Sequence, residues 1–168
     1  FVIVDPARTA NDEGCPTGML AFAVDAHDHK IWVRDEINDR LSIIDGSLSR
    51  QAVDLCKRTN SQILLVEVDG GDDFIKREFM EEVARRGQNI QLLWIEAKKK
   101  SVEGDYGTGL EGRKRRDAQG LLRWYKSKQI IHEHKLKDGP LEKQQLDFPF
   151  PNGFDSLDCA SHLFRAMD

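Results

Sequence analysis

The segment QILLVEV, residues 62–68, is a continuous apolar run that carries one acid, Glu67. Such a run predicts a buried strand. Residues 47–60 before it and 72–86 after it have the apolar spacing and terminal residues of helices, and residues 90–96 predict another strand. Strands that alternate with helices indicate parallel neighbours in an α/β sheet.

The N-terminal part of the chain has a different pattern. Residues 1–5, FVIVD, predict a short buried strand that ends at Asp5, before a proline. Residues 18–25 and 30–38 predict two further strands, joined by a linker that suits a hairpin. We therefore expect a three-stranded antiparallel meander, which joins the helix-flanked strands in one mixed α/β sheet.

The C-terminal part alternates loops with short elements. Residues 97–112 are rich in Lys, Gly and Ser and predict a flexible loop. Residues 113–127 predict a helix, 128–134 a short strand, and 139–147 a turn with a short helix. The last helix is expected over residues 154–167.

Length and composition fit one globular domain of 168 residues, with 39% hydrophobic and 32% charged residues. The net charge of −4 gives no overall attraction to nucleic acid, so a polyanion would need a local basic patch. Three widely spaced cysteines without a C-x-x-C pair predict a reduced, intracellular protein. No secretory signal or membrane-length apolar run is present, and the start at Phe1, inside a strand, indicates an excised domain.

Four acids stand at positions that suggest chemistry. Asp5 ends the first strand, and Glu67 lies within an apolar one. Asp155 and Asp158 open the last helix and, three residues apart, share one of its faces. If the first and fourth strands are neighbours, Asp5 and Glu67 face each other at one edge of the core. Converging acids repel, a divalent cation removes the repulsion, and all-oxygen ligands favour Mg²⁺ or Mn²⁺.

Each acid also has a simpler structural interpretation. Asp5 suits a turn before Pro6, and Glu67 suits the polar face of a strand. Asp155 suits a helix N-cap, and Asp158 is favourable near the positive end of the helix dipole. The combination of the four is what favours a metal site.

Other polar groups nearby are interpreted as structural. Asp69, Asp72 and Asp73 are expected to cap the turn and helix that follow the strand at 62–68. His162 is expected on the surface or in the core of the last helix. Cys159 is expected to be a small buried hydrophobe and not a nucleophile.

Four motifs in series resemble one known family. They are FVIVDPA at 1–7, LLVEVDGGDDF at 64–74, the basic segment LEGRKRRDAQGLLRWYKSKQIIHE at 110–133, and LEKQQLDFPFPNGFDSLDCASHL at 141–163. In content and order they resemble the C-terminal nuclease domain of the large terminase subunit of tailed bacteriophages. The resemblance implies a ribonuclease-H-like fold, related to resolvases and integrases, with residues 1–168 forming a single nuclease domain.

The resemblance also implies a two-metal DNA endonuclease. Two Mg²⁺ or Mn²⁺ ions, about 4 Å apart, would clamp one scissile phosphate. Asp5 is expected to bridge them, with Glu67 on one ion and Asp155 on the other. Asp158 is expected as a further ligand or a supporting group, and Asp12 as a weaker candidate that acts through water. Where many members carry two successive aspartates this chain has one, so the choice between Asp155 and Asp158 as main ligand stays open.

The expected substrate is double-stranded DNA, contacted through its phosphates. Two basic runs flank the predicted loop and suit a phosphate-binding rim, although most charge runs are simply solvated. They comprise Lys98, Lys99 and Lys100, and Arg113, Lys114, Arg115 and Arg116.

The resemblance implies a role and partners as well. The domain would cut concatemeric viral DNA during genome packaging in the host cytoplasm, beside an ATPase motor, a small terminase subunit and a portal. No G-x-x-x-x-G-K-[ST] segment occurs, so the motor is not in this chain. The alternatives are a resolvase- or integrase-like nuclease of the same fold, and a non-catalytic DNA-binding or docking module.

Overall fold

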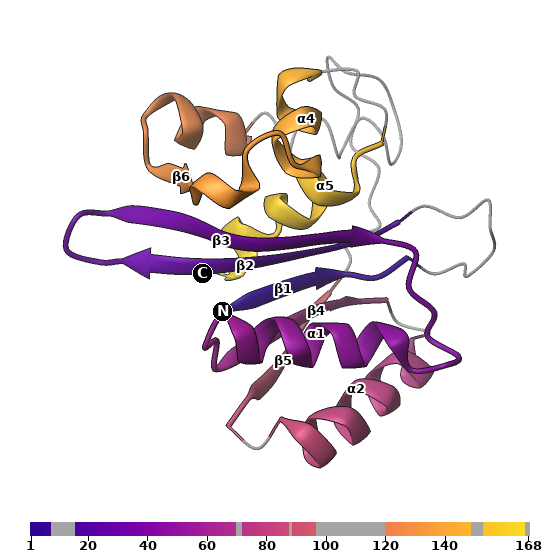
Figure 1. The fold of residues 1–168 in the computed structure, drawn as a ribbon. Helices are drawn as coiled ribbons and strands as arrows, with labels where there is room; N and C mark the ends of the chain where they lie inside the picture. The colour runs from indigo at the N-terminus through magenta and orange to yellow at the C-terminus, as the bar shows by residue number, and fades with distance from the viewer. Residues whose placement is uncertain (8–15, 70–71, 88, 97–119, 149–152, 167–168) are drawn as a thin grey trace.

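The computed structural model describes residues 1–7, 16–69, 72–87, 89–96, 120–148 and 153–166. They form a six-stranded mixed sheet in the order β5-β4-β1-β2-β3-β6 (Figure 1). The strands are β1 (Val2–Asp5), β2 (Thr17–Asp25), β3 (Lys30–Asp39), β4 (Ile63–Val68), β5 (Gln91–Glu96) and β6 (Ile130–His132).

The predicted meander and the predicted parallel strands are both confirmed. The strands β1, β2 and β3 pair antiparallel, whereas β4 pairs parallel with β1, and β5 parallel with β4. The short strand β6 pairs parallel with β3 at the other end of the sheet. Side chains of the central strand β1 are buried on both faces, which explains why its sequence is apolar without alternation.

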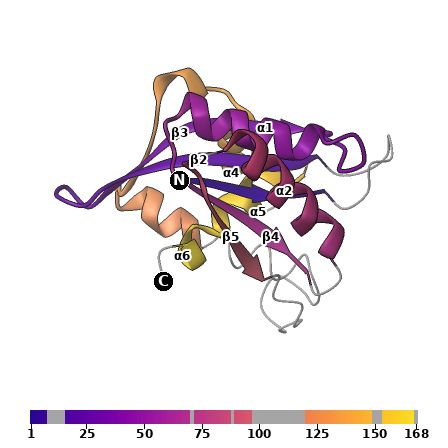
Figure 2. The same ribbon diagram turned by 90° about the horizontal axis from the view of Figure 1, so that it is seen from below.

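Helices cover both faces of the sheet (Figures 1 and 2). One face carries α1 (Ser47–Arg58) and α2 (Asp73–Arg86). The other carries α4 (Pro140–Leu146), α5 (Asp155–Ser161) and α6 (Leu163–Ala166), together with a helical segment at 120–126 and the 3₁₀ turn η1 (His134–Leu136). Along β1 the side chains alternate between the two cores, because successive strand residues point to opposite faces.

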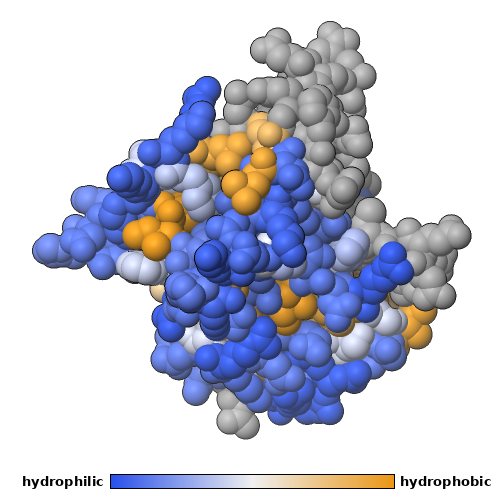
Figure 3. Space-filling model, turned by 45° about the horizontal axis from the view of Figure 1, so that its top comes forward, coloured by the Kyte–Doolittle hydropathy of each residue, from blue (hydrophilic) through white to orange (hydrophobic). Residues whose placement is uncertain are grey.

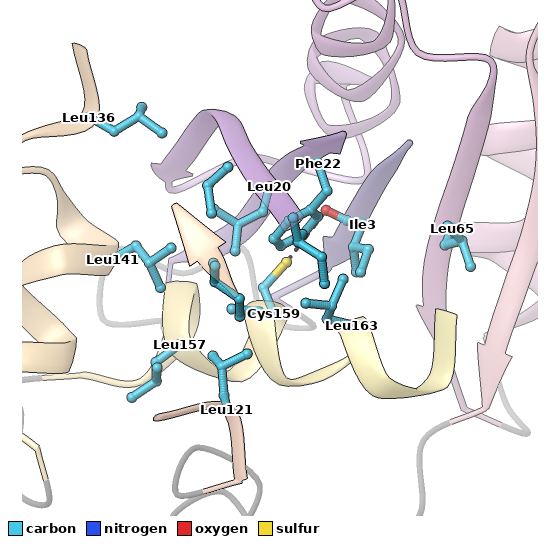
Figure 4. Packing of buried hydrophobic residues seen from close by; sticks show 14 of the residues in the cluster. Ile3, Leu20, Phe22, Leu65, Leu121, Leu136, Leu141, Leu157, Cys159 and Leu163 are labelled. Atoms are coloured by element: carbon cyan, nitrogen blue, oxygen red, sulfur yellow. Dashed lines mark hydrogen bonds between the residues drawn. The ribbon is translucent and has the colours of Figure 1, made fainter. Parts of the chain in front are cut away.

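The two faces thus have separate hydrophobic cores. Val2 and Val4 of β1 pack in the core under α1 and α2, whereas Ile3 packs in the core under α5 and α6 (Figure 4). Hydrophilic residues cover most of the face shown in Figure 3, and hydrophobic ones gather there in a few separate patches. Within the described residues, no helix has both the length and the apolar character that crossing a membrane requires.

The prediction of one continuous last helix is wrong. The helix α5 ends at Ser161, and α6 begins at Leu163 after a turn at His162. Two local hydrogen bonds accompany the break: the His162 N–H donates to the Cys159 carbonyl (3.2 Å), and the Ser161 hydroxyl donates to the Asp158 carbonyl (2.6 Å). Hydrogen bonds between residues three apart tighten a helix end and turn the chain.

The expected caps also differ from the structure. Asp155 is the first residue of α5 and not its N-cap, which is Phe154 without a side-chain capping bond. Asp72 is the N-cap residue of α2 as expected, but it makes no side-chain capping bond to the helix; its carboxylate accepts the Asp69 N–H (2.5 Å) and so closes the turn after β4. The predicted loop at 97–112 and the residues 113–119 of the predicted helix lie outside the described residues.

The core beneath α5 provides a stability test. Leu157 is fully buried there, whereas Leu146 is 78% exposed on α4. We expect Leu157→Ala to lower the free energy of unfolding by about 2–5 kcal/mol, because it removes buried methyl groups and leaves a cavity. Leu146→Ala should change it by less than about 0.5 kcal/mol. Urea unfolding followed by circular dichroism measures both, and equal losses would contradict this packing.

Candidate metal centre

The sheet itself brings Asp5 and Glu67 together. In the parallel pairing of β1 with β4, Val4 lies beside Val66. Asp5 and Glu67 are the next residues of the two strands, so they occupy equivalent places and point to the same face. That face is the one covered by α5 and α6. The expectation that the first and fourth strands are neighbours is therefore confirmed, and the two acids meet at the carboxyl ends of these strands.

A histidine joins the two acids. One ligand atom from each of Asp5, Glu67 and His162 lies within 4.8 Å of the others, and we call these three residues the cluster. The His162 Nε2 and a Glu67 carboxylate oxygen are 3.3 Å apart. His162 is 2% exposed and Glu67 7%, whereas Asp5 is half-buried. Asp5 is therefore the most exposed member of the cluster.

The histidine ring has unmet hydrogen-bonding capacity. Within the described part of the chain, both ring nitrogens of His162 are buried and neither makes a hydrogen bond, although Nε2 lies at ion-pair distance from Glu67. A buried polar nitrogen without a partner is costly, and such groups in native proteins usually have a specific reason. Imidazole nitrogen and carboxylate oxygen are common ligands of divalent transition metals. The residues present therefore fit a divalent cation.

Sequence reasoning missed His162 as a candidate ligand. A usable signal was its spacing: His162 follows Asp158 by four residues and Asp155 by seven, so the three fall on one stripe of a helix. Of this stripe, His162 lies with Asp5 and Glu67, although the helix ends just before the histidine.

The two aspartates of α5 lie next to the cluster and outside it. Gly18 of β2 pairs with Asp5, and a Cβ at Gly18 would overlap the carbonyl group of Asp155. The first turn of α5 therefore rests on the sheet directly beside Asp5. Asp158 is 6% exposed, and Asp155 is half-buried. Neither belongs to the three residues whose ligand atoms converge within 4.8 Å.

The pKa of Cys159 is affected by the acids of this region. Burial raises the pKa of its thiol well above the ordinary value, and the negative charges of Asp5, Asp158 and Glu67 raise this pKa further. The thiol donates to the Ile3 carbonyl (3.4 Å), in the core shown in Figure 4. The prediction that Cys159 is buried is confirmed. That it is unreactive stays a prediction.

The remaining predicted site residues lie outside the described residues. They are Asp12, the lysines Lys98, Lys99 and Lys100, and the basic run Arg113, Lys114, Arg115 and Arg116. Their roles stay predictions.

Solved viral nuclease structures share this fold. The human cytomegalovirus terminase nuclease domain, soaked with Mn, has a TM-score of 0.60 and 12% identity over 99% of this chain and 82% of that one. The nuclease domain of the large terminase g2p from bacteriophage SPP1, with bound Mn, has a TM-score of 0.55 and 12% identity over 99% and 85%. The fowlpox virus Holliday junction resolvase has a TM-score of 0.53 and 12% identity over 99% and 94%.

These likenesses concern the fold. The chain has the ribonuclease-H-like mixed sheet that its sequence predicts, the same fold as terminase nuclease domains. No protein-family model matches the chain, and no curated protein sequence matches it. Function must therefore be argued from the site itself.

Gly18 offers a test of how closely α5 must approach Asp5. We expect Gly18→Ala to lower the free energy of unfolding by about 1–3 kcal/mol, because the new methyl group meets backbone atoms of Asp155. Gly87→Ala is the control: at the end of α2 its methyl group would lie 3.1 Å from the Val83 Cα, a milder contact. Thermal unfolding of both variants measures the difference, and a harmless Gly18→Ala would contradict the close approach.

The thiols give a second test. Burial raises the pKa of Cys56 to about 12, and Cys159 is shifted in the same direction. Because only the thiolate reacts, iodoacetamide at pH 8 should modify neither cysteine in the native protein and both after unfolding. A Cys15→Ser background isolates these two thiols, and mass spectrometry counts the adducts. Alkylation of native Cys159 would show that its environment is open to solvent.

Proposed function

We propose that this chain is a divalent-metal-dependent endonuclease that hydrolyses phosphodiester bonds in DNA. The observation that carries the proposal is the convergence of Asp5, Glu67 and His162 within 4.8 Å, at the carboxyl ends of two neighbouring parallel strands. Ligands of open α/β sheets bind at the carboxyl ends of the strands. The likeness of the fold to terminase nuclease domains with manganese supports the same activity.

Charge supports a cation at this place. Two carboxylates less than 5 Å apart repel by roughly 3 kcal/mol at the effective dielectric constant of about 20 that suits protein sites. A divalent cation between them turns this repulsion into attraction. It would also satisfy a ring nitrogen of His162, which the described residues leave without a hydrogen bond.

The donor set bears on which cation binds. All-oxygen ligands suit Mg²⁺ and Mn²⁺ equally, whereas the imidazole of His162 adds a nitrogen ligand that Mg²⁺ rarely takes. We therefore propose that the site accepts both ions and binds Mn²⁺ more tightly. A second ion would be held by Asp5 together with Asp155 and Asp158 of the adjacent first turn of α5.

The three residues of the cluster differ in exposure, and we propose that they differ in role accordingly. Glu67 and His162 are buried and would hold the ion from within the protein, while Asp5, which is half-buried, would be its more exposed ligand. A phosphate group would thus approach past Asp5. Divalent ions bound there would supply Lewis acidity to the scissile phosphate and to the attacking water.

Binding of DNA is proposed to rest on backbone contacts. The net charge is −4, so the attraction must be local, and the basic runs at 98–100 and 113–116 are the proposed rim. Contacts to phosphate fix the position of the duplex without reading its sequence. The enzyme would therefore select little sequence by itself and lose affinity steeply with salt.

The proposed biological role is cleavage of concatemeric viral DNA during genome packaging. The series of motifs that resembles terminase nuclease domains, together with the matching fold, supports this proposal. In that role the chain is one nuclease domain, working with an ATPase domain of the same full-length protein, a small terminase subunit and a portal.

A junction-resolving nuclease is the second candidate, because the fowlpox virus resolvase has the same fold over 99% of this chain. Such an enzyme cuts paired strands symmetrically, so it should be a stable dimer that prefers four-way junctions to linear duplexes. Sedimentation and cleavage of matched linear and branched DNA distinguish the two candidates.

Cleavage of supercoiled plasmid tests the proposal. We expect nicking and linearisation with Mn²⁺ or Mg²⁺ and none with EDTA. Asp5→Asn should lower the rate at least about 100-fold, since the contribution of a metal ion amounts to several kcal/mol. Asp28→Asn, on an exposed hairpin residue, is the matched control and should cleave at the wild-type rate.

Thermal unfolding with metal gives an independent readout. A ligand that binds only the native state raises the melting temperature, so Mn²⁺ should stabilise the wild type and Asp28→Asn but not Asp5→Asn. A folded wild type that neither cleaves nor gains stability with Mn²⁺ would favour the non-catalytic DNA-binding module.

A further inference from the structure

We propose that Gln144, which lies on α4 and outside the cluster, is a positioning residue for the metal centre because it fixes the first turn of α5. The helix α5 carries Asp155 and Asp158 and leads directly into His162. The inference rests on the proposed function in so far as it concerns cleavage. It has a structural consequence that can be measured without it.

The helix α5 does not hold its own first turn. The first N–H groups of a helix have no partner inside the helix, and Phe154 at the N-cap supplies no side-chain acceptor. With seven residues, α5 is also far too short to be stable alone. Its start must be held by other elements.

Gln144 supplies the missing acceptor. The Leu157 N–H, in the first turn of α5, donates to the Gln144 Oε1 (2.9 Å). Gln144 is 7% exposed and Leu157 fully buried, so water does not compete for this bond. Loss of a buried acceptor leaves the N–H unsatisfied, which costs more than an exposed hydrogen bond contributes.

A second contact ties the same turn to the sheet. The Asn38 Nδ2 of β3 donates to the Ser156 Oγ (2.8 Å), and Ser156 is fully buried. Beneath the turn, Gly18 lets the backbone of Asp155 lie against β2. Consecutive residues of α5 are therefore held from three directions, by α4, by β3 and by β2.

The helix α4 is itself fixed by the sheet. Its N-cap is Gly139, which has no side chain, and the Leu141 N–H donates instead to the Glu36 Oε2 of β3 (3.0 Å). A side chain at Gly139 would overlap the Glu36 carboxylate. Glu36 thus holds the start of α4, and Gln144 of α4 holds the start of α5. The position of Asp155 and Asp158 on α5 therefore depends on β3 through two successive hydrogen bonds, from Leu141 to Glu36 and from Leu157 to Gln144.

The hydrogen bond from Leu157 to Gln144 lies close enough to the cluster to affect its geometry. Leu157 and His162 are five residues apart, about 7.5 Å along a helix. A small tilt at the first turn would move the His162 ring against Asp5 and Glu67. Misplacement of catalytic groups by about 1 Å can cost a factor of about 100 in rate.

The test compares two substitutions at position 144. Gln144→Met keeps the size of the side chain and removes the acceptor, whereas Gln144→Glu keeps an acceptor oxygen for the Leu157 N–H. Thr59→Val is the control, because it removes a hydroxyl that donates to the Leu55 carbonyl (2.7 Å) at the C-terminal end of α1, in another part of the fold. Plasmid cleavage, Mn²⁺ titration and amide hydrogen exchange are measured for each.

We expect Gln144→Met to lower kcat and the Mn²⁺ affinity about 10- to 100-fold, the range for groups that orient metal ligands, with KM for DNA within about twofold. Gln144→Glu should restore most of both. Amides of α5 should exchange faster in Gln144→Met while those of α1 do not. In Thr59→Val the amides of α1 should exchange faster while those of α5 do not, and kcat should equal that of the wild type.

The inference would be overturned if Gln144→Met had the wild-type kcat and its α5 amides exchanged as slowly as in the wild type. It would also be overturned if Thr59→Val lowered kcat and the Mn²⁺ affinity by the same factor as Gln144→Met. If Gln144→Met does not fold, Gln144→Leu, which also removes the acceptor for the Leu157 N–H, takes its place in the test, with the same expected and contrary results. A wild type that lacks metal-dependent cleavage would instead overturn the proposed function, and the exchange of α5 would still decide whether Gln144 holds the helix.

Discussion

The parallel pairing of β1 with β4 is the constraint on which the rest of the site depends. Most residues of both strands are buried, so a charge in the middle of either strand is costly, and the acids come late: Asp5 ends β1, and Glu67 is the next-to-last residue of β4. The register sets Asp5 beside Glu67, and a slip by one residue would turn one of them to the opposite face. The separation of the two carboxylates is thus fixed by backbone hydrogen bonds and not by loops, which is the pre-organisation that metal chemistry needs.

The helical half of the site is held in a different way. The helix α5 is short and depends on single hydrogen bonds from Gln144 and Asn38, whereas the strands share a continuous ladder. A cation bound to Asp5, Glu67 and His162 would connect the two halves, since the histidine follows α5. Its binding energy would then also hold α5 on the sheet, because ligand binding to an ordered site stabilises that order.

The sequence predicted the strands of the sheet and two of the three residues of the cluster, Asp5 and Glu67. The strands have strong apolar runs, and Asp5 and Glu67 stand out because an acid beside such runs is costly. His162 stands out only through its spacing from Asp155 and Asp158, because no Gly or Pro marks the end of α5 at Ser161. Gly18 and Gln144 act on α5 from β2 and α4, and no local pattern relates a glycine or a glutamine to a helix it meets only in the folded chain.

The charge of the site implies an order of binding if the substrate is a phosphodiester. Asp5 and Glu67 already concentrate negative charge at the carboxyl ends of the strands, in a chain whose net charge is −4. A DNA phosphate entering past Asp5 would add to that repulsion. Cations must therefore enter the cluster before or together with the phosphate, since they reverse the sign of the local field. The rim would govern where DNA is held, and the cluster would govern when it is cut.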